Sequence, residues 1–106
     1  MRIGMTIGTV TLVEPHGSIR GGVFRLVVPL GPQDLVEAAR GRLSAAPPSE
    51  PLVAWDDLGC GESQLVAFSE GGEAAQPFRP LDRPVDAFIA ASLDRLDIPD
   101  SQVRPA

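Results

Sequence analysis

The sequence predicts a small, mainly β domain. The segments with the clearest signal are short apolar runs rich in β-branched residues. Along them, apolar and polar residues alternate as they do in a half-buried strand, and residues typical of turns, glycine and proline, separate the runs. At 106 residues the chain is expected to bury roughly two thirds of the surface that its unfolded form exposes. We therefore expect one domain with a small hydrophobic core over residues 1–99, followed by a flexible tail over 100–106.

The first two strands are expected within residues 1–12 and 23–30. Apolar residues alternate along the first run on both sides of Gly8, which is expected to mark a β-bulge or a close strand contact because glycine otherwise weakens a strand. Residues 14–18, which include the only histidine, His16, form a loop between the two runs.

Residues 31–50 differ in composition from the strands around them. Leu35, Ala38 and Ala39 recur at helical spacing within residues 33–43, which indicates a turn or two of helix, and the alanine and proline run of residues 44–50 is typical of a linker. We expect residues 31–50 to be an insertion that the fold tolerates, in preference to a dedicated binding element.

A β-hairpin is predicted over residues 51–68. Two apolar runs, 51–55 and 64–68, flank a corner at residues 56–61, and the first run ends in Trp55. In the corner, Asp56 and two glycines are residues that favour a tight turn. A second glycine corner follows at residues 69–76.

The last predicted element is a helix over residues 84–96. Its apolar residues fall along one stripe, and Pro99 lies beyond its end. They are Val85, Phe88, Ile89, Leu93 and Leu96.

The charge and cysteine content argue against several classes of function. The net charge is -5, the pI is about 4.6, and the chain contains no lysine. Electrostatic binding to nucleic acid or to an anionic membrane is therefore not expected. A single cysteine permits no internal disulfide, and the sequence shows neither a signal peptide nor a membrane-length apolar run, so a cytoplasmic location is expected.

No catalytic set emerges from the reactive residues, and no enzyme activity, metal or cofactor is expected. His16 has no partner at a useful spacing, and no neighbouring base activates Cys60. Ser69 precedes two glycines, as in an anion-binding loop, but the phosphate-loop motif and its lysine are absent. Trp55 is expected to anchor the core or a subunit interface more readily than to bind a ligand.

Four short segments, in order, resemble a known family. They are Gly8-Thr9-Val10, the run Pro51-Leu-Val-Ala-Trp-Asp56, Leu58-Gly-Cys-Gly61, and Pro84-Val-Asp-Ala87. Together they look like the pentameric vertex proteins of bacterial microcompartments, the EutN/CcmL or BMC-P family. This chain departs from the family's glycine-rich turn at Cys60, Ser63 and Gln64, which stand where alanine, glycine and glutamate are usual.

The resemblance implies a five-stranded, OB-like β-barrel with a short C-terminal helix. It further implies a homopentamer that caps the five-fold corners of a cytoplasmic polyhedral shell, beside hexameric and trimeric shell proteins. Candidate residues at subunit contacts or on the five-fold axis are Gly59, Cys60, Gly61, Ser69, Glu70, Gly71, Gly72 and Glu73, and candidates for the pentamer rim are Arg25, Arg79 and Arg83. The alternative is an OB-type binding module or accessory subunit of an enzyme complex.

Overall fold

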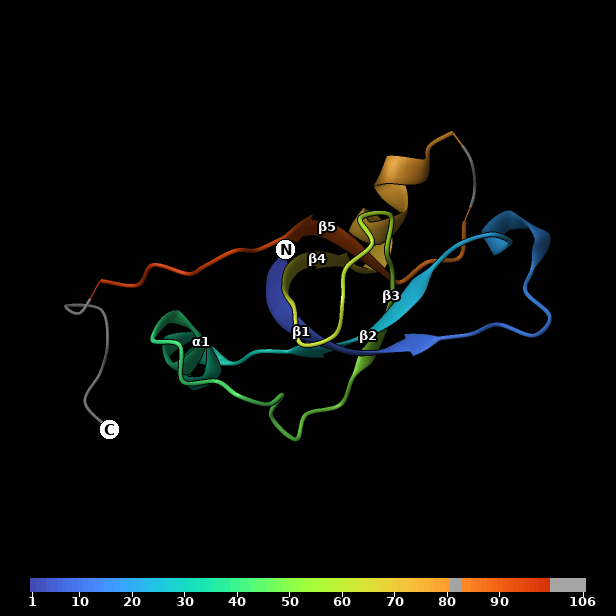
Figure 1. The fold of residues 1–106 in the computed structure, drawn as a ribbon. Helices are drawn as coiled ribbons and strands as arrows, with labels where there is room; N and C mark the ends of the chain where they lie inside the picture. Colours follow the sequence, from blue (N-terminus) through green and yellow to red (C-terminus); the bar gives the residue numbers. More distant parts are fainter. Residues whose placement is uncertain (81–82, 100–106) are drawn as a thin grey trace.

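The computed structural model describes residues 1–80 and 83–99, which form a closed barrel of five strands (Figure 1). Around the barrel the strands follow the order β1-β2-β3-β5-β4. This confirms the five-stranded, OB-like barrel. The strands are β1 (Arg2–Val10), β2 (Phe24–Pro29), β3 (Leu52–Trp55), β4 (Leu65–Glu70) and β5 (Ala87–Ser92).

Strand β1 pairs with both β2 and β4, and it carries the predicted bulge. The register between β1 and β2 shifts between Thr6 and Gly8, so Ile7 is the extra residue. A second glycine, Gly4, faces the barrel interior, where an added Cβ would lie 2.6 Å from Cγ1 of Val27 and 2.9 Å from Cε1 of Phe68. The absence of a side chain at Gly4 therefore lets the barrel close tightly.

The predicted hairpin over residues 51–68 is wrong, because its two strands do not pair with each other. Strand β3 pairs antiparallel with β2, β4 pairs antiparallel with β1, and β5 lies between them. The contact of β5 with β3 is parallel, with Trp55 opposite Phe88, and its contact with β4 is antiparallel. The corner at residues 56–61 thus joins two strands that are separated in the sheet by β5.

The predicted C-terminal helix over residues 84–96 is also wrong. Residues 87–92 form strand β5, in which Ala87 and Ile89 are buried in the barrel core and Ala90 is exposed. A short apolar run is compatible with the spacing of a helix or of a strand. Without residues 87–92, β3 and β4 would each have an unpaired edge, and pairing with both edges favours the strand. The predicted tail at 100–106 lies outside the described residues.

The helices are short. A 3-10 turn, η1 (Gly17–Ile19), lies between β1 and β2, α1 (Pro32–Ala39) confirms the helical turns predicted within residues 33–43, and a second 3-10 segment, η2 (Gly71–Phe78), follows β4. Helix α1 lies at the opposite end of the molecule from the β1–β2 connection (Figure 1). No residue of the segment 31–50 is buried.

The core has two parts, on opposite faces of the sheet. The first fills the barrel and includes Val27, Ala54 and Phe68. The second contains Trp55, which follows Ala54 on β3, and Phe24, which lies three residues before Val27 on β2, so both point to the other face. Ala74 and Phe78 of η2 pack with them. Segment η2 thus covers one outer side of the barrel.

Candidate functional site

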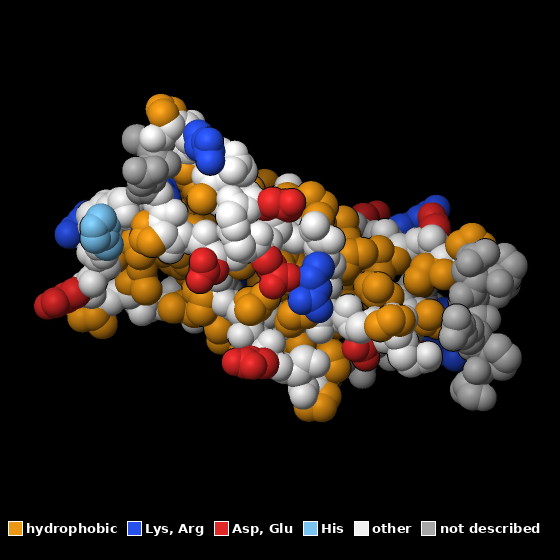
Figure 2. All heavy atoms as spheres, turned by 180° about the vertical axis from the view of Figure 1, so that it is seen from behind, with side chains coloured by type: hydrophobic (Ala, Val, Ile, Leu, Met, Phe, Trp, Pro, Cys, Tyr) orange, Lys and Arg blue, Asp and Glu red, His pale blue; other side chains and the backbone are white. Residues whose placement is uncertain are grey.

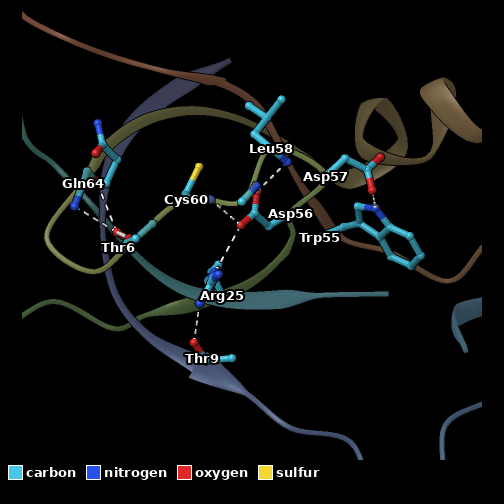
Figure 3. Close-up of polar contacts among 11 residues, drawn as sticks. Thr6, Thr9, Arg25, Trp55, Asp56, Asp57, Leu58, Cys60 and Gln64 are labelled. Atoms are coloured by element: carbon cyan, nitrogen blue, oxygen red, sulfur yellow. Dashed lines mark hydrogen bonds and ion pairs between the residues drawn. The ribbon is translucent and has the colours of Figure 1, made fainter. Parts of the chain in front are cut away.

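The connection between β3 and β4, residues 56–64, is organised around the side chain of Asp56. Asp56 is 3% exposed. Its carboxylate accepts hydrogen bonds from the backbone N–H groups of Leu58 (2.9 Å), Gly59 (3.2 Å) and Cys60 (2.9 Å) (Figure 3). Nε of Arg25 on β2 lies 3.1 Å from the same carboxylate.

These contacts keep Asp56 ionised. Burial by itself would raise the pKa of the carboxyl group, but the N–H groups of Leu58 and Cys60 and the guanidinium of Arg25 stabilise the charged form and lower the pKa below its ordinary value of 3.8. Arg25 also donates to Oγ1 of Thr9 on β1 (Figure 3). The loop is therefore tied through one ion pair to two further strands.

The other half of the loop is tied to Thr6 of β1. Thr6 is fully buried, its hydroxyl donates to the carbonyl of Gly61, and the same oxygen accepts the N–H of Gln64 at 2.9 Å. The N–H of Ser63 donates to the Thr6 carbonyl at 2.7 Å. Ser63 has a φ of 55°, which favours glycine, the residue usual in the resembled family at this position. The loop is thus held at both ends, while residues 57–59, 61 and 62 stay exposed.

Cys60 lies inside this loop but not on its surface. It is 4% exposed and belongs to the cluster that fills the barrel, while its neighbours Gly59 and Gly61 are exposed. Burial, together with the nearby charge of Asp56, raises the pKa of the Cys60 thiol. The side chain is therefore a neutral packing group that anchors the loop.

The second predicted segment, residues 69–73, lies where β4 passes into η2. Its residues are exposed except for the half-buried Ser69, Glu70 forms an ion pair with Arg2 at 3.1 Å, and the N–H of Gly71 donates to the carbonyl of Asp86 at 2.8 Å. Gly71 has a φ of 62°. Because the 56–64 loop enters β4 and residues 69–73 leave it, the structure places the two predicted groups at opposite ends of one strand.

Trp55 is buried at the centre of an aromatic cluster. Its ring meets Phe24 and Phe78 edge to face, with centroids 5.3 and 4.9 Å away, and its indole N–H donates to Asp57 at 2.6 Å. The guanidinium of Arg83 lies 4.9 Å from the Trp55 ring centroid and 4.8 Å from that of Phe78. Both rings thus hold Arg83 by cation–π contact.

Within residues 1–80 and 83–99, no three histidine, cysteine or acidic side chains are grouped so that they could hold a metal ion. His16 precedes η1 as its N-cap residue, and its Nδ1 is 2.7 Å from the hydroxyl of Ser18. No helix in the described part of the chain is long and apolar enough to span a membrane.

Sequence reasoning did not single out the exposed apolar surface. Ile7 and Val53 are 40% and 47% exposed on the outer side of β1 and β3, and Val13 is 93% exposed in the β1–β2 connection. Figure 2 shows hydrophobic side chains between scattered charges over the face seen there. The signal was available at residues 12–13, where two apolar residues in succession break the alternation of the strand.

The fold and sequence both match known proteins. A family described as "Ethanolamine utilisation protein EutN/carboxysome" matches residues 1–94. The structure of Gloeobacter violaceus CcmL is 28% identical, with a TM-score of 0.74 over 92% of this chain and 90% of that one. No curated protein matches the sequence.

Two further structures agree with this. CcmL of a Nostoc species is 26% identical, with a TM-score of 0.71 over 91% of this chain and 92% of its own. The GrpN pentameric microcompartment shell protein from Rhodospirillum rubrum shares the fold at 23% identity, with a TM-score of 0.71 over 92% of this chain and 99% of that one. The match over residues 1–94, together with the shared barrel, shows that the chain belongs to the EutN/CcmL family of microcompartment shell proteins.

Proposed function

We propose that this chain assembles into homopentamers that occupy the five-fold vertices of a bacterial microcompartment shell and close it. The observation that carries the proposal is the closed barrel, which matches CcmL over 92% of the chain at 28% identity, together with the family match over residues 1–94. This match favours a structural role over that of an accessory subunit in an enzyme complex.

The proposed mechanism is geometric. Hexagonal tiles extend as flat sheets, and a closed polyhedron requires five-fold units at its corners. A ring of five identical subunits supplies them when each subunit is rigid enough to hold one angle to its neighbours. The anchoring of the 56–64 loop by Asp56 and Thr6 supplies such rigidity at an exposed edge of the barrel.

The exposed parts of the two predicted segments are proposed to contribute to subunit contacts or to the five-fold axis. Gly59 and Gly61 present backbone on the 56–64 loop, and residues 70–73 present backbone and acidic side chains at the other end of β4. Cys60, which is 4% exposed, supports the first segment from inside the barrel, so its exposed neighbours Gly59 and Gly61 are the better candidates for contact.

Hexameric and trimeric shell proteins are the proposed neighbours at the pentamer rim. Of the three arginines expected there, Arg25 is held inside the chain by Asp56, with 20% of its side chain exposed. Arg79 is exposed, and Arg83 is half-buried against two aromatic rings. Arg79 and Arg83 are therefore the better candidates for contact with acidic groups of an adjoining tile.

Co-expression of the hexameric and trimeric shell proteins with and without this chain tests the proposal. With it, sealed polyhedral particles are expected, and without it, open sheets, tubes or elongated bodies. Particle shape is measured by electron microscopy, and permeability by the access of a small dye to an enclosed protein. Sealed, normally shaped particles formed without this chain or any other vertex protein would overturn the assignment.

A further inference from the structure

Two groups of exposed apolar side chains lie on different parts of the subunit. The first, the arm patch, consists of Leu12, Val13 and Val23 in the connection between β1 and β2, which are 39%, 93% and 44% exposed. The second, the wall patch, consists of Ile7 and Val53, which are 40% and 47% exposed, together with the half-buried Leu26, on the outer face of β1, β2 and β3. Together the two patches contain five of the seven large apolar side chains that are exposed in the described part of the chain, the others being Met1 and Leu58.

The arm patch belongs to a segment that projects from the barrel. The β1–β2 connection extends beyond the strands at the end of the molecule opposite α1 (Figure 1). At its base is a groove of about 300 Å³, whose lining includes Val10, Leu12, Ile19 and Val23. Val13 is left uncovered by every described element of the chain, which makes it available for contact with another subunit.

The wall patch is a consequence of strand register. Gly8 pairs with Leu26, and Leu26 pairs with Val53, so these three residues form one row across β1, β2 and β3. Arg25 and Ala54, the adjacent residues of the same strands, pair with each other on the inner face, which leaves Leu26 and Val53 on the outer one. Ile7, the extra residue of the bulge, is also exposed beside this row.

A ring of five restricts how such surfaces can be used. A contact between two identical patches closes a pair of subunits, whereas a cyclic pentamer needs head-to-tail contacts between two different patches on each subunit. We propose that the arm patch of one subunit packs against the wall patch of the next subunit around the ring. This inference rests on the proposed pentamer and identifies the two surfaces that form its repeated contact.

Charged substitutions test the two surfaces separately. Val13→Asp and Val53→Asp each place a carboxylate in the proposed contact, and each is expected to raise the protein concentration required for half-assembly by about a hundredfold or more. Ala45→Asp is the matched control, since it adds the same charge to an exposed alanine of residues 31–50 and should leave assembly unchanged. Native mass spectrometry measures the oligomer, and circular dichroism shows that each variant is folded.

Crosslinking tests the head-to-tail arrangement. In a Cys60→Ser background, the double variant Val13→Cys with Val53→Cys, treated with a short bis-maleimide, is expected to give a covalent ladder up to five chains. Each single-cysteine variant should give almost none. A strong dimer band from Val13→Cys alone would show that arm meets arm and would overturn the inference.

The outcomes also distinguish the inference from the function on which it rests. A wild-type chain that is not pentameric contradicts the proposed pentamer. A wild-type pentamer that survives both Val13→Asp and Val53→Asp, and that gives no ladder, contradicts only the assignment of the two patches. A pentamer lost in these two variants and kept in Ala45→Asp supports both.

Discussion

At the scale of single residues, the carboxylate of Asp56 has the largest set of polar contacts in the 56–64 loop. It neutralises Arg25 and accepts three backbone N–H groups. Asp56→Ala removes all four contacts and leaves the half-buried guanidinium without its carboxylate, so we expect the free energy of unfolding to fall by about 3–5 kcal/mol. Urea unfolding at pH 7 measures this, with the exposed Asp94→Ala as control. A loss no larger than that of the control would contradict the central place of Asp56.

The same carboxylate predicts a dependence on acid. Its pKa is lowered in the folded chain, so between the folded pKa and the ordinary value of 3.8 the unfolded chain binds more protons than the folded one. The stability contributed by Asp56 is therefore fully present above this window and is lost as the pH falls through it. The difference in unfolding free energy between wild type and Asp56→Ala should be smaller at pH 3 than at pH 7. A difference that stays constant with pH would exclude a lowered pKa.

Gly22 illustrates how the sequence leaves room for the largest side chain. A Cβ at this position would lie 2.5 Å from Cζ3 and 2.7 Å from Cη2 of Trp55. Gly22→Ala should therefore displace the indole ring and reduce the unfolding free energy by about 1–3 kcal/mol, with a change in tryptophan fluorescence. Gly17→Ala is the control, because nothing lies within 4 Å of its added methyl group. Equal effects of the two changes would refute this packing argument.

At the scale of elements, alternation and glycine placement were sufficient to locate strands β1 to β4, but not to predict how all of them pair. The bulge at Gly8 and strand β2 were predictable because their signals are local. The pairing of β3 and β4 was not, since an adjacent pair of strands with a glycine corner is the usual mark of a hairpin, and only β5, far along the chain, separates them. The burial of Cys60, which the resemblance placed only among the candidate contact residues, likewise depends on residues distant in sequence.

The insertion at residues 31–50 is expected to be dispensable for folding. None of its residues is buried, and shortening a loop changes the closure entropy by only about 0.6 kcal/mol per halving of its length. Replacement of residues 33–49 by a short Gly/Ser link should leave a folded pentamer, measured by circular dichroism and native mass spectrometry. The same replacement of residues 57–63 should destabilise the chain strongly, because it removes the N–H groups that bond to Asp56 and Thr6. Collapse of the oligomer on the first replacement would show that the insertion belongs to an interface.

At the scale of the whole molecule, an acidic chain with a small core and uncovered apolar patches is expected to gain stability from assembly. When five folded chains dissociate and unfold together, each tenfold increase in concentration favours the folded ring by four fifths of 1.4 kcal/mol per chain, about 1.1 kcal/mol. For a chain of 106 residues this corresponds to a rise in melting temperature of about 5 °C per tenfold increase. A monomer unfolds without this dependence.

Thermal unfolding across three decades of protein concentration therefore checks the link between assembly and stability. The wild-type chain and Ala45→Asp should melt at temperatures that rise steadily with concentration, whereas Val13→Asp should melt at a lower temperature that does not change. The arm residue Val13 is 93% exposed in the single subunit, so its substitution has little reason to weaken the barrel itself. A flat profile for the wild type would mean that the barrel is stable alone. A Val13→Asp profile as steep as that of the wild type would mean that its apolar arm takes no part in holding the ring together.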